Sequence, residues 1–424
     1  MMKRKEMLSW LASAPVLGAG WLRGKNDTNH ETNERYQGLT AEEAELQRQT
    51  DALPYRDFYN ELGVRTLINA TGTHTYLGGS LMLPEVVQAI QFGVHQYVDM
   101  NEFADRVGER LATLCRAEAA MVTAGAASAL TLGTAAVLTG TDRQKIHDIP
   151  NLPGPRAEVI VQRRHRYSYD HAVRNTGIRF VEVETVEELE AAINERTAMM
   201  LFMNAANFWG EIRDETFLQL GKKHGIPVFI DCAADVPPAE NIWKYNEMGF
   251  DLVTISGGKG LRGPQSTGLL TGRKDLIDAA RMNHSPNSNS IGRGMKVNKE
   301  EMLGLLVAVE QFLKMDEVAW RREQDEIADT IREALDRYPQ LETEIIVQEI
   351  GNHFPQVRID WDEDALEFTH QDLIRELREG HPSIETATKG WLGQGVFVCM
   401  AMARPGQERV VARRLNEIFD RVLS

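Results

Sequence analysis

The 424-residue chain has few cysteines, and the three that it contains are far apart in the sequence. Cys115, Cys232 and Cys399 form no C-x-x-C pair, so neither a zinc site nor a disulfide framework is indicated. The H-E-x-x-H pattern typical of metalloproteases is also absent from the sequence. We therefore expect no metal centre.

The chain also lacks the excess of basic residues that nucleic-acid binding requires. It has 47 Lys and Arg against 62 Asp and Glu, which gives a net charge of −15 at pH 7. Because phosphate contacts need clustered cations, we expect no nucleic-acid partner. The short basic and aromatic stretch RRHRYSYDH, at 163–171, is predicted to line a ligand pocket instead.

No apolar run is long and continuous enough for a comfortable membrane span. The nearest candidate, residues 7–22, is interrupted by Pro15 but follows a basic start that contains Arg4 and Lys5. This layout is that of an export signal and loosely resembles a twin-arginine signal. We expect residues 1–24 to direct export to the periplasm and residues 25–57 to be a polar linker. A cytoplasmic protein with an uncleaved extension is the alternative.

The rest of the chain alternates short apolar strands with amphipathic helices, and its length suits two domains. The predicted strands of the first part are AAMVTAG, AEVIVQ, GIRFVEVE, TAMMLFMN, IPVFIDC, FDLVTIS and STGLLTG. Continuous apolar strands separated by helices indicate a mainly parallel sheet that is covered on both faces. We expect an α/β fold with a large domain over 58–298. A helical stem and a smaller C-terminal α/β domain are expected over 299–424.

Side chains able to do chemistry follow several of these strands, where ligands bind on parallel sheets. Lys259 lies in the glycine-rich stretch SGGKG, whose spacing excludes a nucleotide-binding P-loop. Asp231 closes the preceding strand, 28 residues earlier. This pair is what pyridoxal phosphate chemistry needs. The lysine amine forms a Schiff base with the cofactor aldehyde, and the carboxylate keeps the pyridine nitrogen protonated.

Further residues complete the predicted cofactor site. The amides of Gly125, Ala126 and Ala127, at the start of a helix, would bind the phosphate, as would the hydroxyl of Ser256. His165 is positioned to stack on the ring. Any one of these residues has a common structural alternative, such as a helix cap or a core histidine. The prediction depends on their order and spacing together.

These stretches resemble the bacterial selenocysteine synthase (L-seryl-tRNA selenium transferase) group of fold-type I pyridoxal phosphate enzymes. The resemblance is carried by LINATGT, TAGAASALTLGTAAVL, NAANF, FIDCAAD, FDLVTISGGKGLRGPQSTGLLTGRKDLI and GRGMKVNKEEMLGLLVAVE. It implies Lys259 as the Schiff-base lysine, Asp231 as the pyridine partner and Asn207 near the ring oxygen. It also implies a homodimer or higher homo-oligomer, because sites of this fold usually borrow loops from a second subunit.

The N-terminal region departs from that group, whose members carry a tRNA-binding domain there. The better match is the D-glucosaminate-6-phosphate ammonia-lyase branch. We therefore expect an enzyme that acts on a small amino acid or amino sugar acid through an external aldimine, with Lys259 removing the α-proton. The favoured outcome is α,β-elimination with ammonia release. Alternatives are an aminotransferase, a racemase, a selenocysteine synthase-type transferase and a non-enzymatic scaffold.

The substrate of such an enzyme carries a carboxylate or a phosphate, which requires a cation in the site. Arg262, Arg293, Arg404 and His74 are the candidates. The alternative for each arginine is a salt bridge at the surface or between subunits.

Overall fold

The computed structural model describes residues 57–155 and 157–424, so the predicted export signal lies outside the described residues. Helix α4 (Phe58–Glu61), capped by the Asp57 carboxylate, belongs to a unit that ends at Leu62. All other described elements belong to a second compact unit, Gly63–Ser424. Within the described ranges, no helix combines the length and the apolar character needed to cross a membrane.

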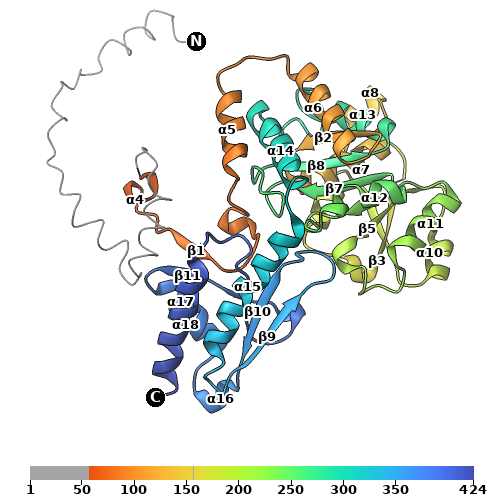
Figure 1. The fold of residues 1–424 in the computed structure, drawn as a ribbon. Helices are drawn as coiled ribbons and strands as arrows, with labels where there is room; N and C mark the ends of the chain where they lie inside the picture. The colour runs from red at the N-terminus through yellow and green to blue at the C-terminus, as the bar shows by residue number, and fades with distance from the viewer. Residues whose placement is uncertain (1–56, 156) are drawn as a thin grey trace, which may run out of the picture. The chain divides into compact units, whose positions relative to one another are not determined.

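The second unit contains a seven-stranded sheet in the order β2-β8-β7-β6-β5-β3-β4. Strands β2, β3, β5, β7 and β8 of this sheet are labelled in Figure 1. Strands β3 to β7 run parallel, and β8 is antiparallel to both of its neighbours. The bounds are β2 (Ala119–Thr123), β3 (Glu158–Gln162), β4 (Arg179–Val183), β5 (Thr197–Met203), β6 (Val228–Asp231), β7 (Leu252–Ser256) and β8 (Gly268–Gly272). All seven were predicted, and the mainly parallel α/β fold is confirmed.

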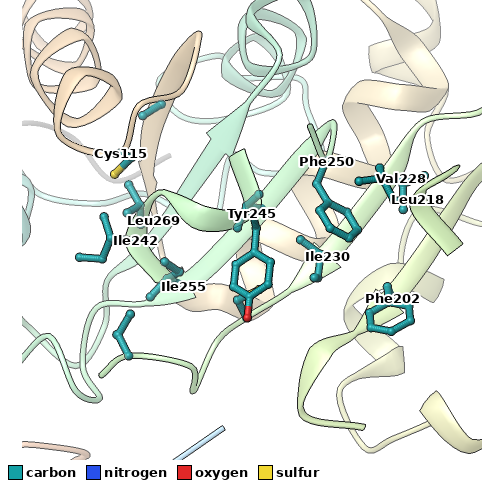
Figure 2. Close-up of a cluster of buried hydrophobic side chains, with 14 of the residues drawn as sticks. Cys115, Phe202, Leu218, Val228, Ile230, Ile242, Tyr245, Phe250, Ile255 and Leu269 are labelled. Carbon is teal, nitrogen blue, oxygen red and sulfur yellow. The ribbon is translucent and has the colours of Figure 1, made fainter. Parts of the chain in front are cut away.

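Helices cover both faces of this sheet because successive residues of each strand point to opposite sides. Phe229 packs in one apolar cluster with α7 and α13. Ile230 packs in another with α6, α11, α12 and α14, part of which Figure 2 shows. The helices of this part are α5 (Pro84–Gly93), α6 (Met100–Leu114), α7 (Gly125–Thr139), α8 (Arg143–Asp148), α9 (Asp170–Arg174), α10 (Val186–Ala192), α11 (Asp214–His224), α12 (Lys244–Met248), α13 (Lys274–Met282) and α14 (Lys299–Phe312). Helix α7 approaches the sheet closely, since a side chain at Gly133 would lie 2.5 Å from the Phe229 ring.

The C-terminal part contains an antiparallel sheet in the order β12-β13-β10-β9. Its elements are α15 (Glu317–Leu335), β9 (Glu342–Val347), β10 (Pro355–Asp360), α16 (Glu363–Leu366), α17 (His370–Glu379), β11 (Ser383–Glu385), β12 (Ala387–Thr388), β13 (Val396–Val398) and α18 (Gln407–Val422). Strand β1 (Leu67–Asn69) pairs in parallel with β11, so the segment after β1 lies beside the C-terminal sheet. The predicted domain boundary between 298 and 299 stays a prediction.

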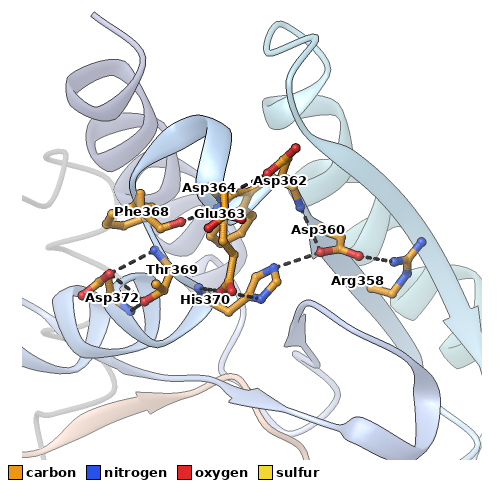
Figure 3. A network of polar contacts seen from close by, with 10 residues as sticks. Arg358, Asp360, Asp362, Glu363, Asp364, Phe368, Thr369, His370 and Asp372 are labelled. Atoms are coloured by element: carbon orange, nitrogen blue, oxygen red, sulfur yellow. Dashed lines mark hydrogen bonds and ion pairs between the residues drawn. The ribbon is translucent and has the colours of Figure 1, made fainter.

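A polar network stabilises the corner where β10 leads into α16 and α17 (Figure 3). The His370 ring lies between Asp360 and Glu363, at 2.9 and 2.8 Å, and Arg358 pairs with Asp360 at 3.0 Å. Helix α17 begins with a reciprocal capping box between Thr369 and Asp372. These contacts tie the end of β10 to α16 and to the start of α17.

Candidate active site

Lys259 lies in a turn three residues after β7, where neighbouring backbone segments pass at close range. A Cβ at Gly258 would lie 2.4 Å from Gln265 Cα, and one at Gly260 would lie 1.9 Å from the Val236 carbonyl oxygen. Glycine is therefore required on both sides of the lysine. Burial lowers the pKa of Lys259, although Asp231 and Asp235 act in the opposite direction. A lowered pKa increases the fraction of free amine, which is the form that acts as nucleophile and base.

Asp231 is the last residue of β6, and its buried carboxylate is held at both oxygens. Oδ1 accepts the Ala233 N–H at 2.9 Å, and Oδ2 accepts the Tyr167 hydroxyl. Burial, reinforced by the charge of Asp231, raises the pKa of Tyr167 well above its usual value, so the phenol remains a donor. Each carboxylate oxygen can accept more than one hydrogen bond. Asp231 can therefore also accept a hydrogen bond from the N–H of a pyridinium ring.

The start of α7 offers a site for an anion. Gly125 has φ +80°. Among the described residues, no side chain caps the helix at Ala124, and a Cβ on Gly125 would meet no atom of another segment within 4 Å. Gly268 passes beside this turn, since its Cβ would lie 2.4 Å from Gly125 C, and it pairs with Ser256 across β7 and β8. Uncapped helix amides bind anions such as phosphate. These residues and the Asp231–Lys259 pair therefore fit pyridoxal phosphate.

Two predicted cofactor residues have their side chains engaged in local packing. His165 is fully buried, accepts the Met203 N–H at Nδ1 over 3.2 Å and packs edge-on against Phe202, and burial lowers its pKa to about 4. The Asn207 side chain accepts the Asp214 N–H at 3.3 Å, at the start of α11. The predicted ring contacts of His165 and Asn207 stay predictions.

A cavity beside Lys259 is lined mostly by polar residues. The residues that line it are Thr71, Gly72, Thr73, His74, Thr75, Tyr169, Lys259, Gln348, Asn352, Phe354, Gln356, Lys389 and Cys399. Burial lowers the pKa of His74, and the nearby Lys389 and Lys259 lower it further. The predicted residue His74 therefore lies within electrostatic reach of two amines. Among the described residues, no aspartate or glutamate lines this cavity.

The three predicted substrate-binding arginines lie elsewhere. Arg262 donates from Nε to the Leu81 carbonyl at 2.9 Å, Arg293 is exposed in the loop between α13 and α14, and Arg404 follows β13. In the part of the chain that the structure describes, none of them lines the cavity. Their substrate contacts stay predictions.

Sequence reasoning missed several residues of this region. Asp235 is buried, its Oδ2 accepts the Asn204 amide at 2.6 Å, and burial raises its pKa to about 6. Its position in the sequence, four residues after Asp231, could have identified it as a candidate. Lys389 and Gln356 gave no such signal, because 33 residues separate them and the C-terminal sheet brings them together.

Comparison with known proteins agrees with this geometry. The profile of the L-seryl-tRNA selenium transferase family matches residues 67–324. The chain is 30% identical to a D-glucosaminate-6-phosphate ammonia lyase of Salmonella typhimurium, over 86% of this chain and 98% of the relative. It is 32% identical to a 5'-C-glycyluridine monooxygenase-decarboxylase of a Streptomyces species, over 85% and 92%. An L-seryl-tRNA(Sec) selenium transferase of Aquifex aeolicus is 24% identical, over 76% and 77%.

Solved structures give the same result. A D-glucosaminate-6-phosphate ammonia-lyase matches with a TM-score of 0.73 and 28% identity, covering 87% of this chain and all of that one. A serine palmitoyltransferase with pyridoxal phosphate matches with a TM-score of 0.55 at 14% identity, over 84% and 88%, which shows the fold-type I architecture alone. By sequence over most of its length, by fold and by the fit of its residues to the cofactor, this chain belongs to the L-seryl-tRNA selenium transferase family and is a pyridoxal phosphate-dependent enzyme.

Proposed function

We propose that this enzyme is a lyase that releases ammonia from an amino sugar acid or a small β-hydroxy amino acid by α,β-elimination. The observation that carries the proposal is the position of Lys259, an amine of lowered pKa beside a cavity lined with hydroxyl and amide groups. The similarity to D-glucosaminate-6-phosphate ammonia lyase over 98% of that relative supports the same substrate class.

Bound pyridoxal phosphate supplies an electron sink for the negative charge that develops beside the substrate amine. Asp231, oriented by Tyr167, holds a proton at the ring nitrogen, and the start of α7 with Ser256 holds the phosphate. Lys259, as a free amine, takes the α-proton. As an ammonium ion it then delivers that proton to the β-hydroxyl, which leaves as water. Hydrolysis of the resulting enamine, after tautomerisation, gives ammonia and a 2-oxo acid.

The polar lining of the cavity matches a polyhydroxylated substrate. Thr73 and Asn352 contact each other at 3.4 Å and present a hydroxyl and an amide to the cavity, and Gln348 adds a second amide. A site built from such groups rejects analogues that lack the matching hydroxyls, because its polar atoms would then be buried without partners. We therefore expect sugar acids to react faster than serine.

The test is a product assay with D-glucosaminate, D-glucosaminate 6-phosphate and both enantiomers of serine. Equal amounts of ammonia and 2-oxo acid from one of these substrates would support the lyase. Lys259→Ala should abolish the release, whereas Lys274→Ala, which removes an exposed lysine paired with Asp278, should not. Transfer of the amino group to an added keto acid, or α-proton exchange without ammonia, would instead indicate an aminotransferase or a racemase.

A second candidate activity follows from the 32% identity to the 5'-C-glycyluridine monooxygenase-decarboxylase. That candidate is an oxygen-dependent decarboxylation of an amino acid. An oxygen electrode and a carbon dioxide assay separate the two activities, because elimination consumes no oxygen and retains the carboxylate. Oxygen uptake that matches carbon dioxide release would replace the lyase proposal.

We further propose a homo-oligomer that is exported. The segment from α5 to the start of α6 carries five exposed apolar side chains, Val87, Phe92, Val94, Tyr97 and Val98. Exposed apolar side chains of this kind are typical of a subunit interface. Light scattering should report a dimer or larger assembly that Tyr97→Asp weakens.

The proposed export has its own test. N-terminal sequencing of protein from a periplasmic extract should show loss of residues 1–24.

A further inference from the structure

Lys389, which directly follows β12, is a buried lysine whose hydrogen-bond partners among the described residues are neutral. Its side chain is 5% exposed, and Nζ donates to the Thr71 carbonyl at 3.3 Å and to Gln356 Oε1. An ammonium group has three donors, so one N–H remains available. Because Lys389 lines the cavity beside Lys259, this donor is available to a ligand there.

The acidic groups near Lys389 do not neutralise it. Burial raises the pKa of the Cys399 thiol, which therefore stays uncharged. Glu385, four residues before Lys389, is bound by Arg378 at 2.8 Å and by the Tyr76 hydroxyl at 3.4 Å. Burial without a counter-ion disfavours the charged amine and lowers the pKa of Lys389. An anion that enters the cavity would therefore supply the partner that Lys389 lacks.

Gln356 provides an independent indication of a ligand. Its side chain lines the same cavity, is 1% exposed, and has no hydrogen-bond partner at Nε2 among the described residues. Gln356 Oε1 accepts a hydrogen bond from Lys389 Nζ, and this orientation of the amide leaves Nε2 without a partner. The NH₂ group is left as a second buried donor beside the ammonium.

We propose that Lys389 and Gln356 form the subsite for the substrate carboxylate. One ammonium and one amide donor match the two oxygens of a carboxylate, whereas a phosphate dianion would favour more cations. Lys259 lines the same cavity as Lys389 and Gln356, so the subsite and the catalytic amine share one cavity. The choice of a sugar acid as ligand rests on the proposed function. The carboxylate-binding role itself does not require that ammonia is released.

The test uses non-reacting ligands that lack an amine, with full-length protein loaded with pyridoxal phosphate. Calorimetry compares D-gluconate with D-glucitol, which has a hydroxyl in place of the carboxylate, and compares both with their 6-phosphates. The wild-type protein should bind D-gluconate about 10- to 100-fold more tightly than D-glucitol, the effect of one charge-assisted hydrogen bond. Lys389→Met should remove this preference, and Lys389→Arg should retain part of it. The preference for a 6-phosphate should be the same in all three proteins.

Gln356→Glu provides a second variant, because it places an internal counter-ion beside Lys389. Gln356→Glu should also abolish the preference for D-gluconate. Circular dichroism and cofactor content should show that Lys389→Met and Gln356→Glu both remain folded. Three results would overturn the proposal: no binding of D-gluconate by the wild-type protein, a preference that survives in Lys389→Met, or loss of the 6-phosphate preference alone. The last result would make the subsite a phosphate site. An enzyme that fails to release ammonia but loses its D-gluconate preference in Lys389→Met would contradict only the proposed function.

Discussion

Replacing Asp235 by asparagine is expected to stabilise the cofactor-free protein at pH 8 and to have little effect at pH 4. The ordinary pKa of this carboxyl is 3.8, and burial raises it to about 6 in the folded protein. The folded state therefore holds the proton more tightly than the unfolded state. This contribution to stability is fully present below the unfolded pKa and is lost as the pH rises through the folded pKa. The difference corresponds to about 3 kcal/mol of unfolding free energy.

Urea unfolding followed by circular dichroism measures this effect at both pH values. The free energy of unfolding of Asp235→Asn should exceed that of the wild-type protein by up to about 3 kcal/mol at pH 8, and the gap should mostly close at pH 4. Asp364→Asn, which changes an exposed aspartate of α16, is the matched control and should show no such pH dependence. An equal difference at both pH values, or a destabilised variant at pH 8, would refute the reasoning.

Two further substitutions test the cofactor site. Tyr167→Phe removes the hydroxyl that donates to Asp231, so kcat/KM should fall about tenfold or more while the fold is retained; unchanged kinetics would show that the phenol does not orient the carboxylate. Gly268→Ala places a Cβ 2.4 Å from Gly125 C, so the start of α7 must shift. The affinity for pyridoxal phosphate should therefore fall, and the free energy of unfolding should fall by about 1–3 kcal/mol. Gly294→Ala, which meets no atom within 4 Å, should leave both unchanged, and equal cofactor affinity in the two variants would contradict the phosphate assignment.

The part of the site that depends on the central sheet could be predicted from the sequence. Apolar strands, each followed by a small or charged residue, place those residues at one edge because parallel strands all end there. Gly125, Asp231 and Lys259 follow β2, β6 and β7 in the structure, as chain order indicated, and their roles stay predictions. The same pattern does not reveal side-chain direction. His165 follows β3 as expected, but its ring turns into the core against Phe202.

The part of the site that the C-terminal region provides could not be predicted. Lys389 and Gln356 meet because β12, β13 and β10 are neighbours in an antiparallel sheet, and Thr71 joins them through the pairing of β1 with β11. Nothing in local composition specifies which distant segments pair. Arg262, Arg293 and Arg404 were predicted to bind the substrate from the chemistry of the guanidinium group alone. The cation that the C-terminal region contributes to the cavity is Lys389.

The most direct test of the central claim is peptide mapping after borohydride reduction of the protein with pyridoxal phosphate. We expect a stable pyridoxyl group on Lys259 and none on that peptide in a Lys259→Ala variant, which should also release no ammonia. A pyridoxyl group on Lys389 instead, the other lysine that lines the cavity, would contradict the assignment of Lys259 as the catalytic amine. Absence of any adduct would contradict the assignment of pyridoxal phosphate as the cofactor.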